Sequence, residues 1–212
     1  MHSGPASRGA ALVLQRLYRH LPAMEQHLHI AERTGWPDEI PTLSAGYPRE
    51  VWDAHPHLRK PTRNWMAAHA GFRRLADVLR DDAEQFLDAK IAADFYGARL
   101  ARLARMLTVN LHGHHTFEDR SFFPEINAVD PRFGSGLEVL EADHMELDQT
   151  LDRFERHARR SLQLAELDPG QLKDEVGALH KVTEGLQGFL ARHLADEEDL
   201  IVPIILHHRM RG

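Results

Sequence analysis

Apolar residues recur at helical spacing over most of the chain. From Thr62 onward the pattern divides into four long stretches, residues 62–87, 91–120, 135–166 and 170–202. Pro131 and Gly134 mark the junction between the second and third stretches, and Asp168-Pro169-Gly170 marks the junction between the third and fourth. The junction between the first two has neither Gly nor Pro. The pattern predicts an all-α protein built as an up-down-up-down four-helix bundle.

The first 61 residues differ from the rest. Residues 8–33 show the spacing of an additional, N-terminal amphipathic helix. Residues 34–61 hold many of the prolines together with Trp36, Tyr47 and Trp52, which predicts a long ordered loop because the aromatic rings need burial. We therefore expect residues 1–61 to form a helix and a Pro/aromatic-rich loop packed on the bundle, and residues 62–212 to form the bundle domain.

The composition narrows the function class. The net charge of -6 argues against a nucleic-acid partner. The chain shows no apolar run long enough for a membrane span and no secretory signal, so we expect a cytoplasmic protein without membrane attachment. It has no cysteine but 16 histidines, so any metal would be held by nitrogen and oxygen. The oligomeric state is left open.

One motif occurs twice in the same frame. His114 and Glu118 are four residues apart and are followed by an apolar pair and Pro124, and His193 and Glu197 are followed in the same way by Pro203. Residues at i and i+4 share a helix face about 6 Å apart along the axis, so each pair could converge on a metal. We expect both prolines to end their helices. A single copy would be read as an ordinary hydrogen-bonded pair, but the repetition favours a site.

Two further histidines interrupt apolar stripes at matching depth. The midpoint between His144 and His193 falls between Asp168 and Pro169, at the turn predicted independently. The midpoint between His69 and His114 falls between Ile91 and Ala92. Helices joined by a hairpin bring residues equally far from the turn to one height, so a bundle would gather four histidines and two carboxylates in one layer. Two buried carboxylates require cations, and nitrogen with carboxylate ligation suits iron, with manganese or zinc as substitutes.

These motifs resemble those of hemerythrin-like proteins, the HHE cation-binding domains, over about residues 64–207. The resemblance rests on His69, on the run from His114 to Pro124, on Glu141-Ala-Asp-His144, and on the run from His193 to Pro203. It implies a four-helix bundle with two non-haem iron ions bridged by two carboxylates and an oxo or hydroxo group, which binds or senses oxygen or iron. The metal ligands it implies are His69, His114, Glu118, His144, His193 and Glu197.

One position departs from the oxygen carriers of that family. The resemblance implies a fifth histidine in those carriers, four residues after the ligand on the third helix. This chain has Asp148 at that position. The missing imidazole would leave an open or water-filled position, or an aspartate ligand. That departure favours redox reactivity or sensing over simple oxygen carriage.

Other residues near the motifs receive blander interpretations. His115 with Asp119 is one residue out of frame and is expected beside the ligands or at the surface. Glu141 with His144 imitates a ferritin-type pair, but only one copy is present. The run from Asp196 to Asp199 is expected to be solvated except for Glu197, and Trp65 to pack over the site.

Three functions stay open at this stage. The favoured one is binding of oxygen, a related small diatomic molecule or peroxide, for sensing or redox handling. The second is an enzyme that turns over peroxide or nitric oxide at the same centre. The third is a metal-free helical interaction module.

Overall fold

The computed structural model describes residues 28–211, and every regular element within them is a helix. The chain divides into two compact units, Met1–Thr34 and Gly35–Gly212. Most of the N-terminal helix expected over residues 8–33 lies outside the described residues, and residues 28–33 of it form turns. Over the described part of the chain, the prediction of an all-α protein is confirmed.

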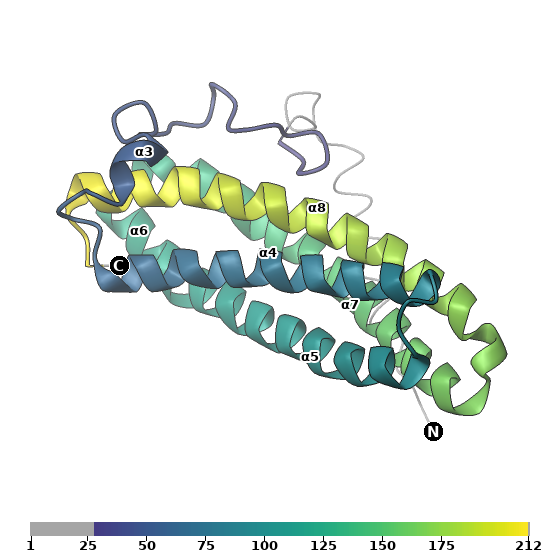
Figure 1. Ribbon diagram of the computed structural model, residues 1–212. Helices are drawn as coiled ribbons and strands as arrows, with labels where there is room; N and C mark the ends of the chain where they lie inside the picture. Colours follow the sequence, from purple (N-terminus) through teal and green to yellow (C-terminus); the bar gives the residue numbers. More distant parts are fainter. Residues whose placement is uncertain (1–27, 212) are drawn as a thin grey trace, which may run out of the picture. The chain divides into compact units, whose positions relative to one another are not determined.

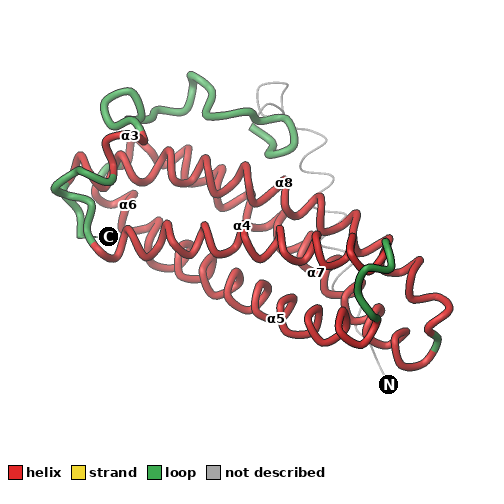
Figure 2. Tube along the Cα trace, in the orientation of Figure 1, coloured by secondary structure: helices red, strands yellow, loops and turns green. Residues whose placement is uncertain are grey.

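Four long helices make up the second unit (Figures 1 and 2). They are α4 (Lys60–Leu87), α5 (Ala93–Phe117), α7 (Gly134–Leu167) and α8 (Pro169–His208). Helix α4 packs against α5 and α8, and α7 packs against the same two helices. None of the described helices is both long enough and apolar enough to cross a membrane.

The two junctions inside the helical pairs differ in how the chain turns. Asp168 alone separates α7 from α8, where the sequence predicted a turn. Residues 88–92 separate α4 from α5, and Ala89 takes a left-handed conformation there with φ of 58°. This turn escaped the sequence signals because glycine usually occupies such a position.

Neither proline of the repeated motif ends its helix. Helix α5 runs directly into a π-helical turn, η1 (Glu118–Phe122), and then into α6 (Phe123–Val129), with Pro124 in the first turn of α6. Pro203 lies inside α8, which continues to His208. The expectation was wrong because a proline removes only one backbone hydrogen bond, and the buried apolar residues around both positions favour continued packing. After α6, the short 3₁₀ helix η2 (Pro131–Phe133) leads into α7.

An apolar cluster fills one end of the second unit, and we call it the apolar plug. It joins α6, η2, the start of α7 and the end of α8, and residues before α4 also contribute. Its members include Trp52, Leu58, Trp65, Phe122, Phe123, Ile126, Phe133, Leu137, Leu140, Leu200 and Ile201. Water is thereby excluded from the end of the bundle next to Glu118 and Glu197.

Within the second unit, residues 35–59, which contain the short helix α3 (Arg49–Trp52), lie along α8 (Figure 2). The indole Nε1 of Trp36 donates to the carbonyl of Asp196 at 2.7 Å. Arg49 donates to the carbonyl of Ala195 at 2.9 Å. Trp36 therefore has a partner on α8, and the hydroxyl of Tyr47 lies 3.1 Å from Nδ1 of His207 on the same helix. Trp52 instead donates to the carbonyl of Tyr47 at 2.8 Å, within the loop.

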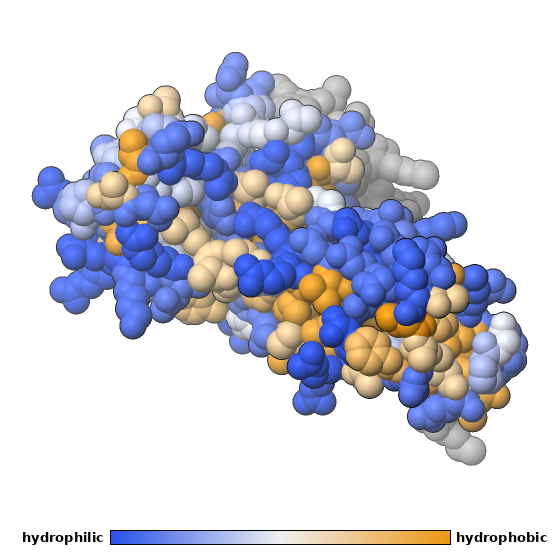
Figure 3. Space-filling view, viewed as in Figure 1, coloured by the Kyte–Doolittle hydropathy of each residue, from blue (hydrophilic) through white to orange (hydrophobic). Residues whose placement is uncertain are grey.

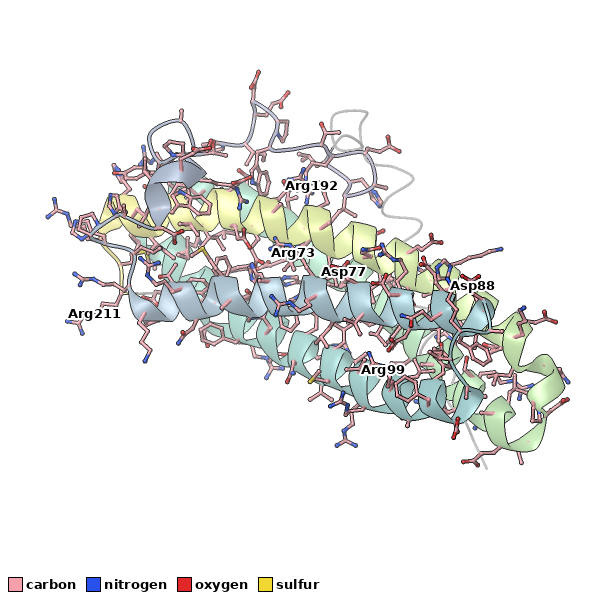
Figure 4. All side chains as sticks on the ribbon, viewed as in Figure 1. Arg73, Asp77, Asp88, Arg99, Arg192 and Arg211 are labelled. Carbon is pink, nitrogen blue, oxygen red and sulfur yellow. The ribbon has the colours of Figure 1, made fainter. Side chains whose placement is uncertain are left out.

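A polar seam runs between α4 and α8. Figure 4 shows Arg73 and Asp77 on the side of α4 that faces α8. Gln187 on α8 links two residues of α4. Its amide nitrogen donates to Asp77, and its amide oxygen accepts from Arg80 at 2.9 Å. Arg73 donates to Glu198 at 3.1 Å. The seam leads along the two helices toward a cluster of histidines and carboxylates.

Candidate metal centre

Seven side chains from all four long helices and η1 gather in the interior beside the apolar plug. They form two neighbouring groups, in each of which the potential ligand atoms lie within 4.8 Å of one another. The first group holds His69, His114, Glu118 and Glu197, and the second holds His115, His144 and His193. All six residues proposed from the sequence are therefore brought together, and His115 is added.

The first group is assembled from α4, α5, η1 and α8. The Nε2 atoms of His69 and His114 lie 2.8 Å apart. His114 Nε2 lies 2.9 Å from Glu118 Oε1, and His69 Nε2 lies 3.4 Å from Glu197 Oε2. Atoms bound to one metal at about 2.1 Å and at right angles lie about 3 Å apart, so these distances suit a shared ion.

The second group is assembled across α5, α7 and α8. The rings of His115 and His144 stack with centroids 4.1 Å apart, and the ring of His193 meets His144 edge-on at 4.9 Å. The Nε2 atoms of His144 and His193 are buried and make no hydrogen bond to the described residues. A buried nitrogen without a partner destabilises the fold unless a bound ligand or metal satisfies it.

Two carboxylates lie between the groups. Glu118 Oε1 faces the first group, whereas its Oε2 lies 3.7 Å from His144 Nε2. Glu197 Oε2 lies 3.4 Å from His69 Nε2 and 3.9 Å from His193 Nε2. Both side chains are fully buried, and Glu118 Oε2 and both oxygens of Glu197 have no hydrogen-bond donor among the described residues. Bound cations would satisfy these oxygens, which otherwise have no partner in the described part of the chain.

The carboxyl groups of Glu118 and Glu197 have pKa values shifted in opposite directions. Burial acts to raise the pKa of Glu118, but hydrogen bonds from His114 and His69 outweigh it and hold that pKa well below its ordinary value. Burial, reinforced by the nearby charge of Glu118, raises the pKa of Glu197 well above its ordinary value. One of the paired acids therefore keeps its proton until a positive charge replaces it.

Three histidines of the cluster have an acidic partner at their outer nitrogen. His69 Nδ1 lies 3.0 Å from Glu198, His144 Nδ1 lies 2.7 Å from Asp119, and His193 Nδ1 lies 3.2 Å from Asp143. An ionised carboxylate only accepts, so each Nδ1 donates, and in the neutral imidazole it is then Nε2 that carries the lone pair a metal would bind. This arrangement fixes the tautomer in which imidazole binds a metal.

The acidic run on α8 is more buried than the sequence suggested. Asp196 and Glu198 are buried along with Glu197, so the prediction that Glu197 alone points inward was wrong. Arg192 pairs with Asp196, and Arg49 and Arg73 pair with Glu198. Burial opposes the ionised form of Glu198, but hydrogen bonds from His69 and Arg49 and the charge of Arg73 lower its pKa to about 2. The two arginines that pair with Glu198 come from outside α8, so the burial of Glu198 could not be predicted from the sequence of α8.

His115 was expected beside the ligands or at the surface, and the structure contradicts the surface alternative. It is buried and belongs to the second histidine group, not to the surface. Burial and the nearby imidazoles lower the pKa of His115, so its ring is neutral, and neither of its nitrogens has a hydrogen-bond partner in the described residues. Adjacent residues on a helix point about 100° apart, so His114 can face one group while His115 faces the other. The signal that could have found it was the His-His pair itself.

Asp148 takes no part in the cluster. Its side chain is 57% exposed, and its carboxylate lies 3.2 Å from Nδ1 of His112 on the outer side of α5. The interpretation of Asp148 as a ligand therefore has no geometric support. Trp65, in contrast, lies over the site as expected: its indole Nε1 donates to Glu118 Oε1 at 2.6 Å, and its ring lies 4.2 Å from that of His69.

The donor set therefore fits metal binding. It offers five imidazoles and two carboxylates, buried, close together and with several donor atoms unpartnered. These features define the class: a helical protein with a buried cluster of histidines and glutamates that could hold metal.

Comparison with known families names the group within that class. The family of the hemerythrin HHE cation-binding domain matches residues 60–205, a span that runs from α4 into the last turns of α8. The chain therefore belongs to the hemerythrin HHE cation-binding domain family. Comparisons with curated proteins and with solved structures give no significant match.

Proposed function

We propose that the chain is a di-iron protein that binds oxygen or a related small ligand, for sensing or redox handling. The observation that carries this proposal is the placement of Glu118, whose two carboxylate oxygens face different histidine groups. A carboxylate in that position would hold two cations side by side. His69 and His114 would hold one ion, and His115, His144 and His193 would hold the other, with Glu118 and Glu197 shared.

Iron is the metal we favour, with manganese or zinc as substitutes, because imidazole with carboxylate is the donor set that non-haem iron prefers. When bound, the iron ions supply redox chemistry that the side chains lack. The chain itself fixes the imidazoles through Glu198, Asp119 and Asp143, and the apolar plug excludes water. Trp65 restrains Glu118 by its hydrogen bond, which keeps one carboxylate oxygen toward each group.

His115 bears on the choice between binding and turnover. Position 148 lacks the fifth imidazole that would favour simple ligand binding, and His115 on α5 offers one to the cluster instead. We therefore favour ligand binding over turnover of peroxide or nitric oxide. The expectation of a cytoplasmic protein stays a prediction.

The bundle topology belongs to the same proposal. We infer that α4, α5, α7 and α8 alternate in direction, up-down-up-down. Support comes from the short connections at residues 88–92 and at Asp168, and from the contacts of α4 and α7 with the same two neighbours.

The test is the iron-to-protein ratio of protein purified without chelators, with visible absorption spectra under air and under nitrogen. We expect about two irons per chain and a spectrum that changes reversibly with oxygen. Rapid irreversible oxidation with turnover of peroxide or nitric oxide would favour the enzyme. Near-zero iron, manganese and zinc would favour a metal-free interaction module and refute the proposal.

A further inference from the structure

A hollow of about 410 Å³ opens between α4 and α5. It is lined by Ala68, Gly71, Phe72 and Leu75 from α4 and by Met106, Asn110 and His114 from α5. Figure 3 shows hydrophobic residues gathered along the face where these two helices lie in Figure 1.

The hollow reaches the candidate metal centre through His114. The side chain of His114 is 9% exposed, whereas those of His69, Glu118, His193 and Glu197 are fully buried. The ring of Phe72 packs edge-on against that of His114 at 5.1 Å between centroids. His114 is thus a member of the cluster that also forms a wall of an opening to the surface.

The walls of the hollow are loosely packed at Gly71 and Met106. A Cβ atom added at Gly71 would meet no heavy atom within 4 Å. Met106 is 40% exposed, so its flexible side chain lies at the outer part of the wall. The Cβ atom of a larger residue at position 71 would therefore start in open space at the wall of the hollow.

The chemistry of the walls selects the kind of occupant. None of the lining residues is an acid, a lysine or an arginine, and Asn110 and His114 are its polar members. An ion entering here would lose water without gaining a counter-ion, whereas a small apolar molecule loses little.

We propose that this hollow is a binding and access site for a small, uncharged, apolar gas molecule. The destination of that molecule rests on the proposed function, because His114 leads to the candidate di-iron centre. Occupancy of the hollow itself does not depend on metal identity.

The first test uses xenon as the probe. Crystals of the purified protein pressurised with xenon should show a xenon atom between Gly71, Met106 and His114. Gly71→Phe should remove it, because the added ring fills the same space. Gly177→Phe is the matched control, since Gly177 also lies within a helix with no atom near its missing Cβ. Absence of xenon from the wild-type hollow, or its persistence in Gly71→Phe, would overturn the proposal.

The second test measures the rate of the oxygen reaction of reduced, iron-loaded protein by stopped flow. Gly71→Phe should slow it by about ten-fold, because the added ring fills the access space, at an unchanged iron-to-protein ratio. Gly177→Phe should leave the rate unchanged. Met106→Ala, which only removes atoms from the outer wall, should raise the rate and covers the case in which Gly71→Phe fails to fold. Unchanged rates in both wall variants would refute the access role.

The two tests separate this inference from the proposed function. A wild-type protein that binds no iron, or that does not react with oxygen, would contradict the proposed function. Xenon in the hollow would still establish the apolar site. Iron loading without xenon binding would leave the metal centre standing and reject the hollow.

Discussion

Nδ1 of His69 lies 3.0 Å from a carboxylate oxygen of Glu198, and both side chains are buried. The same carboxylate accepts from Arg73 on α4 and from Arg49 on α3. His69 is thus oriented by an acid that is itself held from two sides. The orientation of a candidate ligand depends on a segment outside the four long helices.

Glu198→Gln should weaken metal binding by roughly 10- to 100-fold, because the neutral amide orients the His69 imidazole poorly. Metal affinity measured by competition with a chelator checks this. Asp199→Asn is the matched control, since Asp199 also accepts from Arg49 at 2.7 Å but has no contact with His69. An equal loss in both variants would mean that the anchoring of Arg49 matters, and not the orientation of His69.

His115→Ala should lower the metal content toward one ion per chain, because it removes one of the three imidazoles of the second group. Asp148→Ala should leave the metal content unchanged, because the Asp148 carboxylate faces His112 on the outside of the bundle. Metal analysis of both variants, purified in parallel, decides the matter. A full metal complement in His115→Ala would return that residue to a packing role.

Glu197→Gln should stabilise the metal-free protein and weaken metal binding. The pKa of Glu197 is raised by burial and by Glu118. The folded chain then keeps a proton that the unfolded chain releases above about pH 4.3, so this group makes the free energy of unfolding fall as the pH rises above that value. The glutamine variant should show a flatter dependence in urea titrations of metal-free protein between pH 4.5 and 7, values chosen to span that window.

Glu184→Gln is the control for that experiment, because Glu184 is largely exposed. It should leave the pH dependence unchanged. A metal-free Glu197→Gln protein that is less stable than the wild type at pH 7 would show that the carboxyl is satisfied without a cation.

Gly136→Ala should destabilise the fold by about 1–3 kcal/mol through overpacking. A Cβ there would lie 2.8 Å from Leu200 Cδ2, and Leu200 is fully buried within the apolar plug. Gly188→Ala is the matched control, since its Cβ would meet nothing within 4 Å and alanine favours the helix by about 1 kcal/mol over glycine. Thermal unfolding of both variants checks this prediction: the melting temperature should fall for Gly136→Ala and rise for Gly188→Ala.

The apolar spacing was enough to predict the four long helices, because burying one stripe is what holds such helices together. The repeated His/Glu motif, and the matching distances of His69 and His144 from the turns, predicted six of the seven residues that the structure brings together. What it missed depends on contacts between segments distant in sequence. Glu198 is buried because Arg49 and Arg73 reach it, and no periodicity within α8 encodes those arginines.

His115 and the prolines were missed for a different reason. The interpretation assumed one ligand-bearing face on each helix, whereas α5 presents His114 to one group and His115 to the other. The prolines were read by their backbone preference alone, which cannot weigh the apolar packing around Pro124 and Pro203.

The π-helical turn at Glu118–Phe122 makes the continuous helical segment of α5, η1 and α6 one residue longer than regular α-helical winding requires. A π turn carries one residue more than the α-helical turn it replaces. Deleting the exposed Arg120 would therefore restore regular winding, with Glu118 and Phe123 still facing inward. The same deletion at the exposed Arg102 would rotate one half of the helix against the other by about 100°. Tolerance of a shortened chain should thus be confined to the boundary between the histidine cluster and the apolar plug.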